Sequence, residues 1–224
     1  MKRATRRMRK MLVLVACFAM IAGIAIGGTI AWLQDTTKTV TNEFTTTDIS
    51  VTLTEEGATA GTDGNMTREY EFVPSVNLPK APYVTASCDV DYYVFVKVEP
   101  VGWVKDINDN YKYILYDGEV ECSVYSDPDS ETDKGWMYLP TDDTDGYVYY
   151  QIKTGGEDFE DYVLTGDEVN ENGVVIVKST LTDEDMNPEN GAQDNISLTF
   201  TAYAIQQVGF DNATAAWNAA KTNN

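Results

Sequence analysis

Acidic side chains are the most abundant reactive groups in this sequence, and histidine is missing. The 224 residues include 36 Asp and Glu, 16 Lys and Arg, and no His. The lack of histidine excludes Ser-His-Asp and Cys-His nucleophile systems, HExxH zinc proteolysis and histidine metal sites. Paired carboxylates serve glycosidases, but with so many acids close pairs arise by chance. We therefore predict that the protein is not an enzyme and has no cofactor.

Two Asp-rich stretches could hold a hard cation such as Ca²⁺. "DDTDG" (residues 142–146) and "SDPDSETD" (residues 126–133) place carboxylates at alternate positions. Neither stretch has the complete twelve-residue loop with its distal Glu, so Asp-rich turns are the simpler interpretation. The N-x-S/T sequences at Asn65, Asn195 and Asn212 are weak glycosylation signals, because threonine-rich chains produce them by chance.

Cysteine offers a second kind of chemistry. Of the three cysteines, Cys88 and Cys122 follow the apolar N-terminal segment that contains Cys17. An exported chain with two cysteines can form one disulfide. The alternative is that both are small buried residues. Their spacing does not decide between these alternatives, and two thiols alone are not expected to hold a metal.

The N-terminus has the composition of an export signal. Residues 1–10 carry six positive charges and no negative one, and no charge follows from Met11 to Ile26. A helix of that apolar length spans only about 24 Å, which is short for a bilayer. Small residues, Thr29 and Ala31, precede Trp32 at the −3 and −1 positions of a cleavage site. We predict a signal peptide of residues 1–31, with retention as a membrane anchor or a lipobox at Cys17 as alternatives.

Residues 32–224 are strongly acidic. They keep ten basic and all 36 acidic residues, a formal net charge of −26. Nucleic-acid binding requires clustered Lys and Arg, so we predict no nucleic-acid partner. A chain of this size buries one good core, and we predict a single domain over residues 32–224.

Period-2 alternation of apolar residues runs through most of the chain and predicts strands. In "DISVTLTE" the apolar residues Ile49, Val51 and Leu53 alternate with Ser and Thr, as in a half-buried strand. Turn-forming acidic stretches such as "TGGEDFED" (residues 154–161) and "TDEDMNPENG" (residues 182–191) separate the runs. Only residues 212–221 are predicted to be helical. The fold class is therefore all-β: a single antiparallel β-sandwich, with a jelly roll as the favoured topology, and a short C-terminal helix. Further predicted strands are residues 92–99, 111–116, 146–153, 173–181 and 195–206.

Residues 27–55 carry a family resemblance. "GGTIAWLQD", "NEF" and "ISVTLTE" resemble the export signal and first strand of the TasA/camelysin family of Gram-positive secreted proteins. The resemblance implies cleavage by a SipW-type signal peptidase and a role as a jelly-roll subunit of biofilm-matrix fibres, in the extracellular matrix or at the cell surface. It also implies a homopolymer in which a freed N-terminal segment pairs with the next subunit, with an assembly helper protein as a further candidate partner. Camelysins are described as metalloproteases, an activity that the lack of histidine argues against.

The segment Trp32–Phe44 is suited to strand pairing. It is polar, rich in threonine and free of Pro and Gly, so it favours an extended strand that is unstable alone. We predict that it is donated to a sheet edge of the next subunit. Folding back as the domain's own edge strand is one alternative, and a monomeric surface module that binds glycan or protein through aromatic residues is another. The predicted assembly residues are Trp32, Leu33, Asp35, Val40, Asn42 and Phe44.

Overall fold

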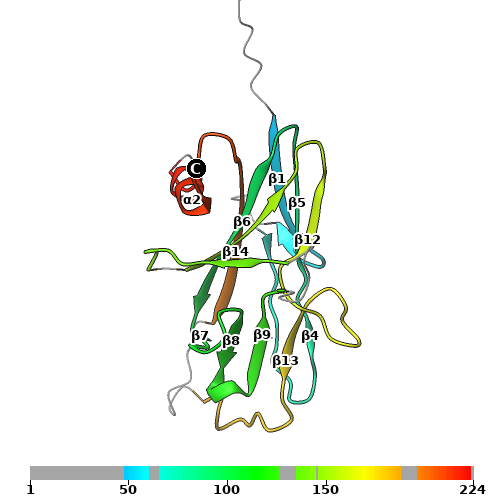
Figure 1. Ribbon diagram of the computed structural model, residues 1–224. Coiled ribbons are helices and arrows are strands. Elements are labelled where there is room, and N and C mark those ends of the chain that lie inside the picture. The colour runs from blue at the N-terminus through cyan, green and yellow to red at the C-terminus, as the bar shows by residue number, and fades with distance from the viewer. Residues whose placement is uncertain (1–47, 61–65, 127–134, 145, 188–195, 223–224) are drawn as a thin grey trace, which may run out of the picture. The chain divides into compact units, whose positions relative to one another are not determined.

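A computed structural model describes residues 48–60, 66–126, 135–144, 146–187 and 196–222. The chain divides into two compact units, Met1–Thr46 and Thr47–Asn224, and all described residues belong to the second unit. This unit consists of antiparallel strands and one short α-helix (Figure 1), which confirms the predicted all-β sandwich with a short C-terminal helix. The strands are β1 (Ile49–Glu55), β2 (Thr59–Ala60), β3 (Met66–Thr67), β4 (Leu78–Pro79), β5 (Pro82–Cys88), β6 (Tyr92–Val101), β7 (Val104–Lys105), β8 (Lys112–Leu115), β9 (Val120–Ser123), β10 (Met137–Leu139), β11 (Tyr147–Lys153), β12 (Phe159–Tyr162), β13 (Val174–Val177) and β14 (Ser197–Gln206), and the helices are the 3-10 turn η1 (Tyr116–Gly118) and α2 (Ala213–Ala220).

The strands form two layers. The first layer is the sheet with strand order β10-β11-β6-β14. The second contains the sheets β1-β5-β12 and β4-β13-β9-β8-β7, which meet around residue 163. There the amide of Val163 donates to the carbonyl of Pro82 at 2.9 Å, and the amide of Tyr125 donates to the carbonyl of Val163 at 2.8 Å. This strand order does not establish a jelly roll, which stays a prediction.

The main core lies between the two layers. Val94, Val96 and Val98 of β6 point into it and are completely buried, as the alternation of a strand with one inward face requires. From the opposite layer, the Tyr113 hydroxyl of β8 lies 2.8 Å from the Tyr149 hydroxyl of β11. This hydrogen bond between buried tyrosines links the layers in the middle of the apolar core.

The helix α2 covers part of the outer face of the first layer. Trp217 is 1% exposed, and its ring packs on Phe95 and Tyr203. Asn212 caps the helix, because its side chain accepts a hydrogen bond from the Ala215 amide at 3.0 Å. The outward residues of β6 and α2 therefore form a second, smaller apolar cluster.

Most predicted elements are confirmed, and one turn prediction is wrong. The runs at residues 48–55, 92–99, 111–116, 146–153, 173–181 and 195–206 contain β1, β6, β8, β11, β13 and β14, and the helix at residues 212–221 contains α2. The acidic stretch "TGGEDFED", predicted as a turn, contributes most of β12. Its apolar residue Phe159 is 2% exposed and packs against Trp136, so core packing outweighs the local turn preference.

Candidate functional site

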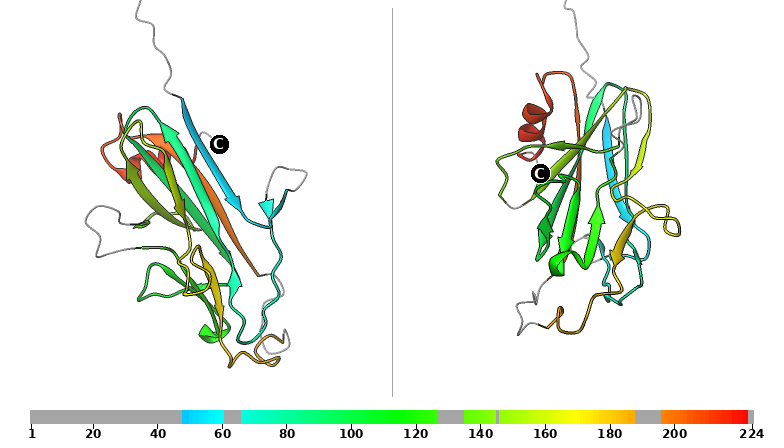
Figure 2. Two further views of the ribbon diagram at one scale, coloured as in Figure 1. Left: turned by 90° about the vertical axis from the view of Figure 1, so that its right-hand side faces the viewer. Right: turned by 60° about the horizontal axis from the view of Figure 1, so that its bottom comes forward.

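Two long edge strands lie side by side on one flank of the sandwich. Among the strands that the structure describes, β1 pairs only with β5, and β14 pairs only with β6. The Cα atoms of β1 and β14 nevertheless approach within 8 Å, and Figure 2 shows the two strands running next to each other. We call this flank the seam. It presents backbone N–H and C=O groups that no described strand uses.

The apolar side chains that face the core from the seam are incompletely covered. On the neighbouring strands, inward residues such as Val84 of β5 and Val96 of β6 are 0% exposed. The inward residues of β1 and β14 are only half-buried, so apolar surface remains that a further strand could cover. They are Ile49, Val51 and Leu53 in β1 and Leu198, Phe200, Ala202 and Ala204 in β14.

The other edge strands of the two layers are protected against pairing. β4 has two residues and contains Pro79, β7 has two and contains Lys105, and β10 has three. β12 has four residues, including Glu160 and Asp161. Short length, proline and charge are the usual means by which sheet edges avoid further pairing. In contrast, β1 has seven residues, β14 has ten, and Glu55 at the end of β1 is their only charge.

The far flank of the sandwich is closed by a side chain. Lys105 on β7 reaches across to β10 and β11, where its Nζ lies 3.5 Å from the ring centroid of Tyr138 and 4.2 Å from that of Tyr147. These are favourable cation–π distances. Burial lowers the pKa of Lys105 to about 8, although Asp109 acts in the opposite direction. The seam therefore has open strand edges, whereas the far flank is covered by the Lys105 side chain.

An ion pair bridges one end of the seam, where β1 ends and β14 begins. Lys80 Nζ lies 3.2 Å from Oε2 of Glu55 on β1 and 5.2 Å from the ring centroid of Phe200 on β14. The Tyr70 hydroxyl donates to Oε1 of Glu55 at 2.5 Å. Burial and the bond to Glu55 raise the pKa of Tyr70, which keeps this hydroxyl protonated. Gly173 allows the close backbone approach that seats Lys80, since a Cβ at Gly173 would lie 2.4 Å from the Lys80 carbonyl oxygen.

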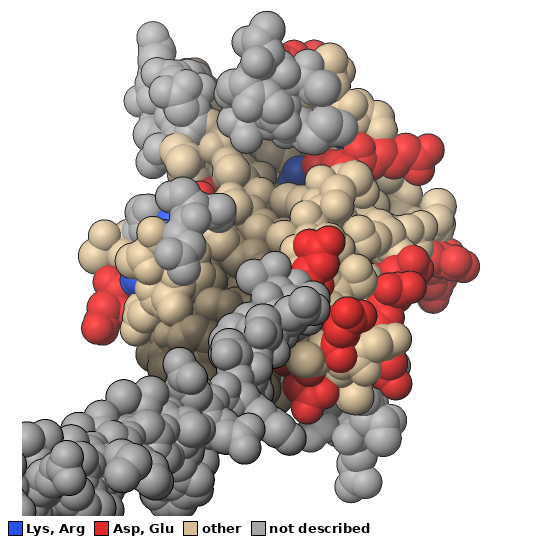
Figure 3. Space-filling model, turned by 90° about the horizontal axis from the view of Figure 1, so that it is seen from above, with Lys and Arg blue, Asp and Glu red and all other residues tan. Residues whose placement is uncertain are grey.

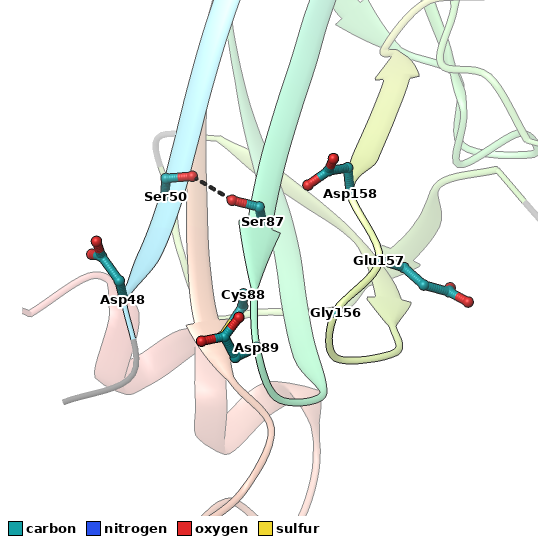
Figure 4. A pocket seen from close by; sticks show the side chains of 8 residues that line it. All are labelled: Asp48, Ser50, Ser87, Cys88, Asp89, Gly156, Glu157 and Asp158. Atoms are coloured by element: carbon teal, nitrogen blue, oxygen red, sulfur yellow. Dashed lines mark hydrogen bonds between the residues drawn. The ribbon is translucent and has the colours of Figure 1, made fainter. Parts of the chain in front are cut away.

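An acid-lined hollow lies at the other end, where β1 begins. It has a volume of about 260 Å³, and its polar lining includes Ser50 and Ser87, whose hydroxyls are 2.9 Å apart (Figure 4). Figure 3 looks onto this end and shows acidic side chains gathered along one side. Within the described residues, His, Cys, Asp and Glu form no cluster that could hold a metal ion. The hollow's carboxylates belong to Asp48, Asp89, Glu157 and Asp158.

The predicted cleavage and assembly residues lie outside the described residues. These are Thr29, Ala31, Trp32, Leu33, Asp35, Val40, Asn42 and Phe44. The chain enters the described domain at Asp48, so whatever precedes β1 starts from the end that carries the acid-lined hollow. Predictions about the signal peptide and the donated strand therefore stay predictions.

The two cysteines are free thiols in this structure. Cys88 at the end of β5 is 5% exposed, and Cys122 in β9 is 2% exposed. Burial raises the pKa of the Cys122 thiol to about 12, so this thiol stays protonated and unreactive near neutral pH. In this structure both cysteines occupy the positions of small buried residues, and their pairing stays a prediction.

One of the Asp-rich stretches has a structural role. Asp143 accepts a hydrogen bond from Trp217 Nε1 at 2.7 Å and from Lys221 Nζ at 2.8 Å, so its two carboxylate oxygens anchor α2. Burial acts to raise the pKa of Asp143, but these two hydrogen bonds outweigh it and hold the pKa below 3.8. Most of "SDPDSETD", together with Asn65 and Asn195, lies outside the described residues.

Replacing Asp143 by Ala is expected to loosen α2. The change leaves the Trp217 Nε1 group without its acceptor, which costs about 1–3 kcal/mol. Because the pKa of Asp143 is lowered in the folded state, its contribution is present above the unfolded value and is lost as the pH falls through the folded one. The protection factors of the amides in residues 213–220, which correct for the intrinsic pH dependence of exchange, should therefore fall in the variant, and in the unmodified protein below about pH 4.

Asp142→Ala is the matched control, because it removes the same charge from an exposed position in the same loop. Equal exchange in the Asp142→Ala and Asp143→Ala variants would show that Asp143 is not the anchor.

The aromatic residues are mostly internal. Trp136 and Trp217 are at most 1% exposed, and Trp103 is half-buried against Phe72. In the part of the chain that the structure describes, Tyr125 is the only aromatic residue among the exposed large hydrophobic ones. A sugar-binding module that stacks glycans on open aromatic faces has little support from this distribution.

Sequence reasoning missed the features that define the seam. The strand runs named from the sequence do not include Pro82–Cys88, although Cys88 is expected to lie in a strand and the residues of this segment alternate in burial. Lys80 lies in "LPKAPYVTA", and nothing in that stretch indicates contact with Glu55 or Phe200. Glu55 lies 25 positions before Lys80 in the sequence, and Phe200 lies 120 positions after it. Strand alternation could have identified β5, but no local signal could have identified the bridge.

Comparisons of the chain with protein-family models, curated proteins and solved structures find no match. In the described residues, no helix has the length and apolar character needed to cross a membrane.

Proposed function

We propose that this protein is a secreted structural subunit that self-assembles into extracellular biofilm-matrix fibres. Each subunit donates its N-terminal strand to the seam of the next one. The observation that carries the proposal is the pair of long, almost uncharged edge strands β1 and β14, which lie side by side with half-buried inward faces. Such edges bind an extended segment through main-chain hydrogen bonds, while alternate side chains fix its register.

The length of the N-terminal segment fits this role. Residues 32–44 span about 43 Å when extended, and a ten-residue strand such as β14 spans about 34 Å. Residues 45–47 add about 10 Å of connection before the described domain begins. The segment, called the arm from here on, can therefore follow the whole seam of a neighbouring subunit and still be joined to its own domain.

The partners and location follow from the same proposal. The main partner is another copy of the chain, and a SipW-type signal peptidase frees the arm at Trp32 during export. The family resemblance of residues 27–55 supports both statements and adds an assembly helper protein as a further partner. The excess of acid over base gives no surface for nucleic acid.

Replacing Ala202 by Lys is expected to block assembly. Ala202 faces the core from β14 and is half-buried at the seam, so a long charged side chain there would occupy the space of the donated strand. Thr199→Lys is the matched control, because Thr199 is exposed on the same strand and the charge change is identical. Negative-stain microscopy of both purified secreted chains, each beginning at Trp32, tests the expectation.

The proposal requires filaments from the Thr199→Lys chain and none from the Ala202→Lys chain. Circular dichroism and thermal melting show whether both variants fold. Filaments of equal number from two folded variants would contradict a role for the seam in assembly.

A further inference from the structure

The ion pair at the end of the seam connects its two strands. Lys80 is held by the Glu55 carboxylate of β1 while its Nζ lies against the Phe200 ring of β14. Tyr70 completes the group, because its hydroxyl donates to Glu55 and also lies 3.0 Å from a second acceptor, the carbonyl of Pro79. The Lys80 ammonium also lies 5.3 Å from the Tyr70 ring centroid. A movement of β1 away from β14 would therefore disturb either the contact of Lys80 with the Phe200 ring or the ion pair of Lys80 with Glu55.

Stability alone does not explain an ion pair at this position. The side chains of Lys80 and Glu55 are 11% and 13% exposed. Buried ion pairs contribute little net stability, because desolvation offsets their attraction, and an apolar replacement of similar volume often performs as well. What distinguishes this ion pair is its position, because Lys80 contacts both Glu55 at the end of β1 and the Phe200 ring of β14.

A strand can be inserted between β1 and β14 only if the contacts of Lys80 with Glu55 and Phe200 break. Paired strands lie about 4.8 Å apart, so a strand that pairs with both β1 and β14 needs them about 9.6 Å apart. In the structure their Cα atoms approach within 8 Å. The seam must therefore widen before it can accept a strand on both sides.

We propose that Lys80, Glu55 and Tyr70 form a latch that keeps the seam closed in the free subunit and opens when the arm of a second copy is inserted. This inference rests on the proposed function. The latch restrains the free subunit from pairing too early, because only the fraction of subunits with an open seam can accept an arm. Release of the latch increases that fraction and with it the rate of assembly.

The test is a double variant, Glu55→Gln with Lys80→Met, made in the chain that begins at Trp32. Changing both partners together avoids leaving one uncompensated buried charge. The variant is expected to assemble about tenfold faster, in proportion to its larger open fraction. Amide exchange in β1 and β14 of the monomer should quicken as well. Light scattering measures the first effect and mass spectrometry the second.

The matched control removes a second ion pair, which joins β8 and β9 and includes no residue of β1 or β14. Lys112 Nζ lies 2.6 Å from Oε2 of Glu121 between β8 and β9, so Glu121→Gln with Lys112→Met changes the same charges. This control is expected to leave the assembly rate and the exchange of β1 and β14 unchanged. Tyr70→Phe, which removes the hydroxyl bonded to Glu55 and keeps the ring, should act in the same direction as the latch variant but more weakly.

The two possible failures are distinguishable. If the unmodified chain assembles and needs its arm, but the latch variants neither assemble faster nor exchange faster in β1 and β14, the latch is wrong and strand donation stands. If the unmodified chain does not assemble, the proposed function fails, and the exchange measurement on the monomer still decides whether Lys80 holds the seam closed.

Discussion

A chain that lacks residues 32–44 is expected to stay monomeric under conditions in which the chain that begins at Trp32 forms filaments. The deletion removes no described residue, so the sandwich and its seam should stay intact. What is lost is the extended segment that would supply hydrogen bonds and apolar contacts to the neighbouring seam. Size-exclusion chromatography and electron microscopy of the two secreted chains measure the difference, which should be complete loss of polymer.

A chain with the residues of the arm in shuffled order is the control. It keeps the length, composition and charge of the arm and changes only the order of its side chains. It should assemble poorly if pockets along the seam select particular side chains at particular positions. A few residues added before Trp32 should slow assembly by obstructing insertion. Filaments that form equally well without the arm would rule out donation from this end.

Replacing Trp136 by Ala is expected to cause a large loss of stability. Trp136 is 0% exposed, contacts Phe159 edge to face at a centroid distance of 5.6 Å, and donates from Nε1 to the Tyr162 carbonyl at 2.9 Å. It therefore fixes both ends of β12 at once. Truncation of a buried tryptophan costs about 3–5 kcal/mol, a large part of the stability of a typical domain. Urea denaturation followed by circular dichroism gives the difference.

Val104→Ala serves as the control for this substitution, because Val104 is 59% exposed. Its effect should stay within about 0.5 kcal/mol. If Trp136→Ala costs no more than Val104→Ala, then Trp136 does not hold β12 in place.

The elements with strong local signals could be predicted from the sequence. In β1, apolar and polar residues alternate without interruption, and β6 and β14 are long runs rich in β-branched and aromatic residues. The helix α2 follows a capping asparagine, Asn212, and consists largely of alanine. In each case the local preference and the tertiary environment agree.

The candidate site could not be predicted, because it depends on strand neighbours. Within the described sheets, β1 is an edge because it pairs only with β5, and β14 is an edge because it pairs only with β6. In both pairs the two strands lie far apart in the sequence. The local composition of β12 favours a turn, and only the burial of Phe159 explains its strand. Likewise, the role of Asp143 becomes visible only once α2 lies beside its loop.

The difference between the two flanks has a consequence for the shape of the proposed polymer. Among the described strands, one flank carries an open pair of edges, and the other is closed by Lys105 on its tyrosine rings. Each subunit then has one arm and one acceptor, and the two are different surfaces, so the contact is heterologous and, in the proposed fibre, repeats from one subunit to the next. Growth is linear and unbranched, and the filament has polarity: one terminal subunit shows a vacant acceptor and the other an unused arm. A subunit without its arm would bind one end only and act as a chain terminator there.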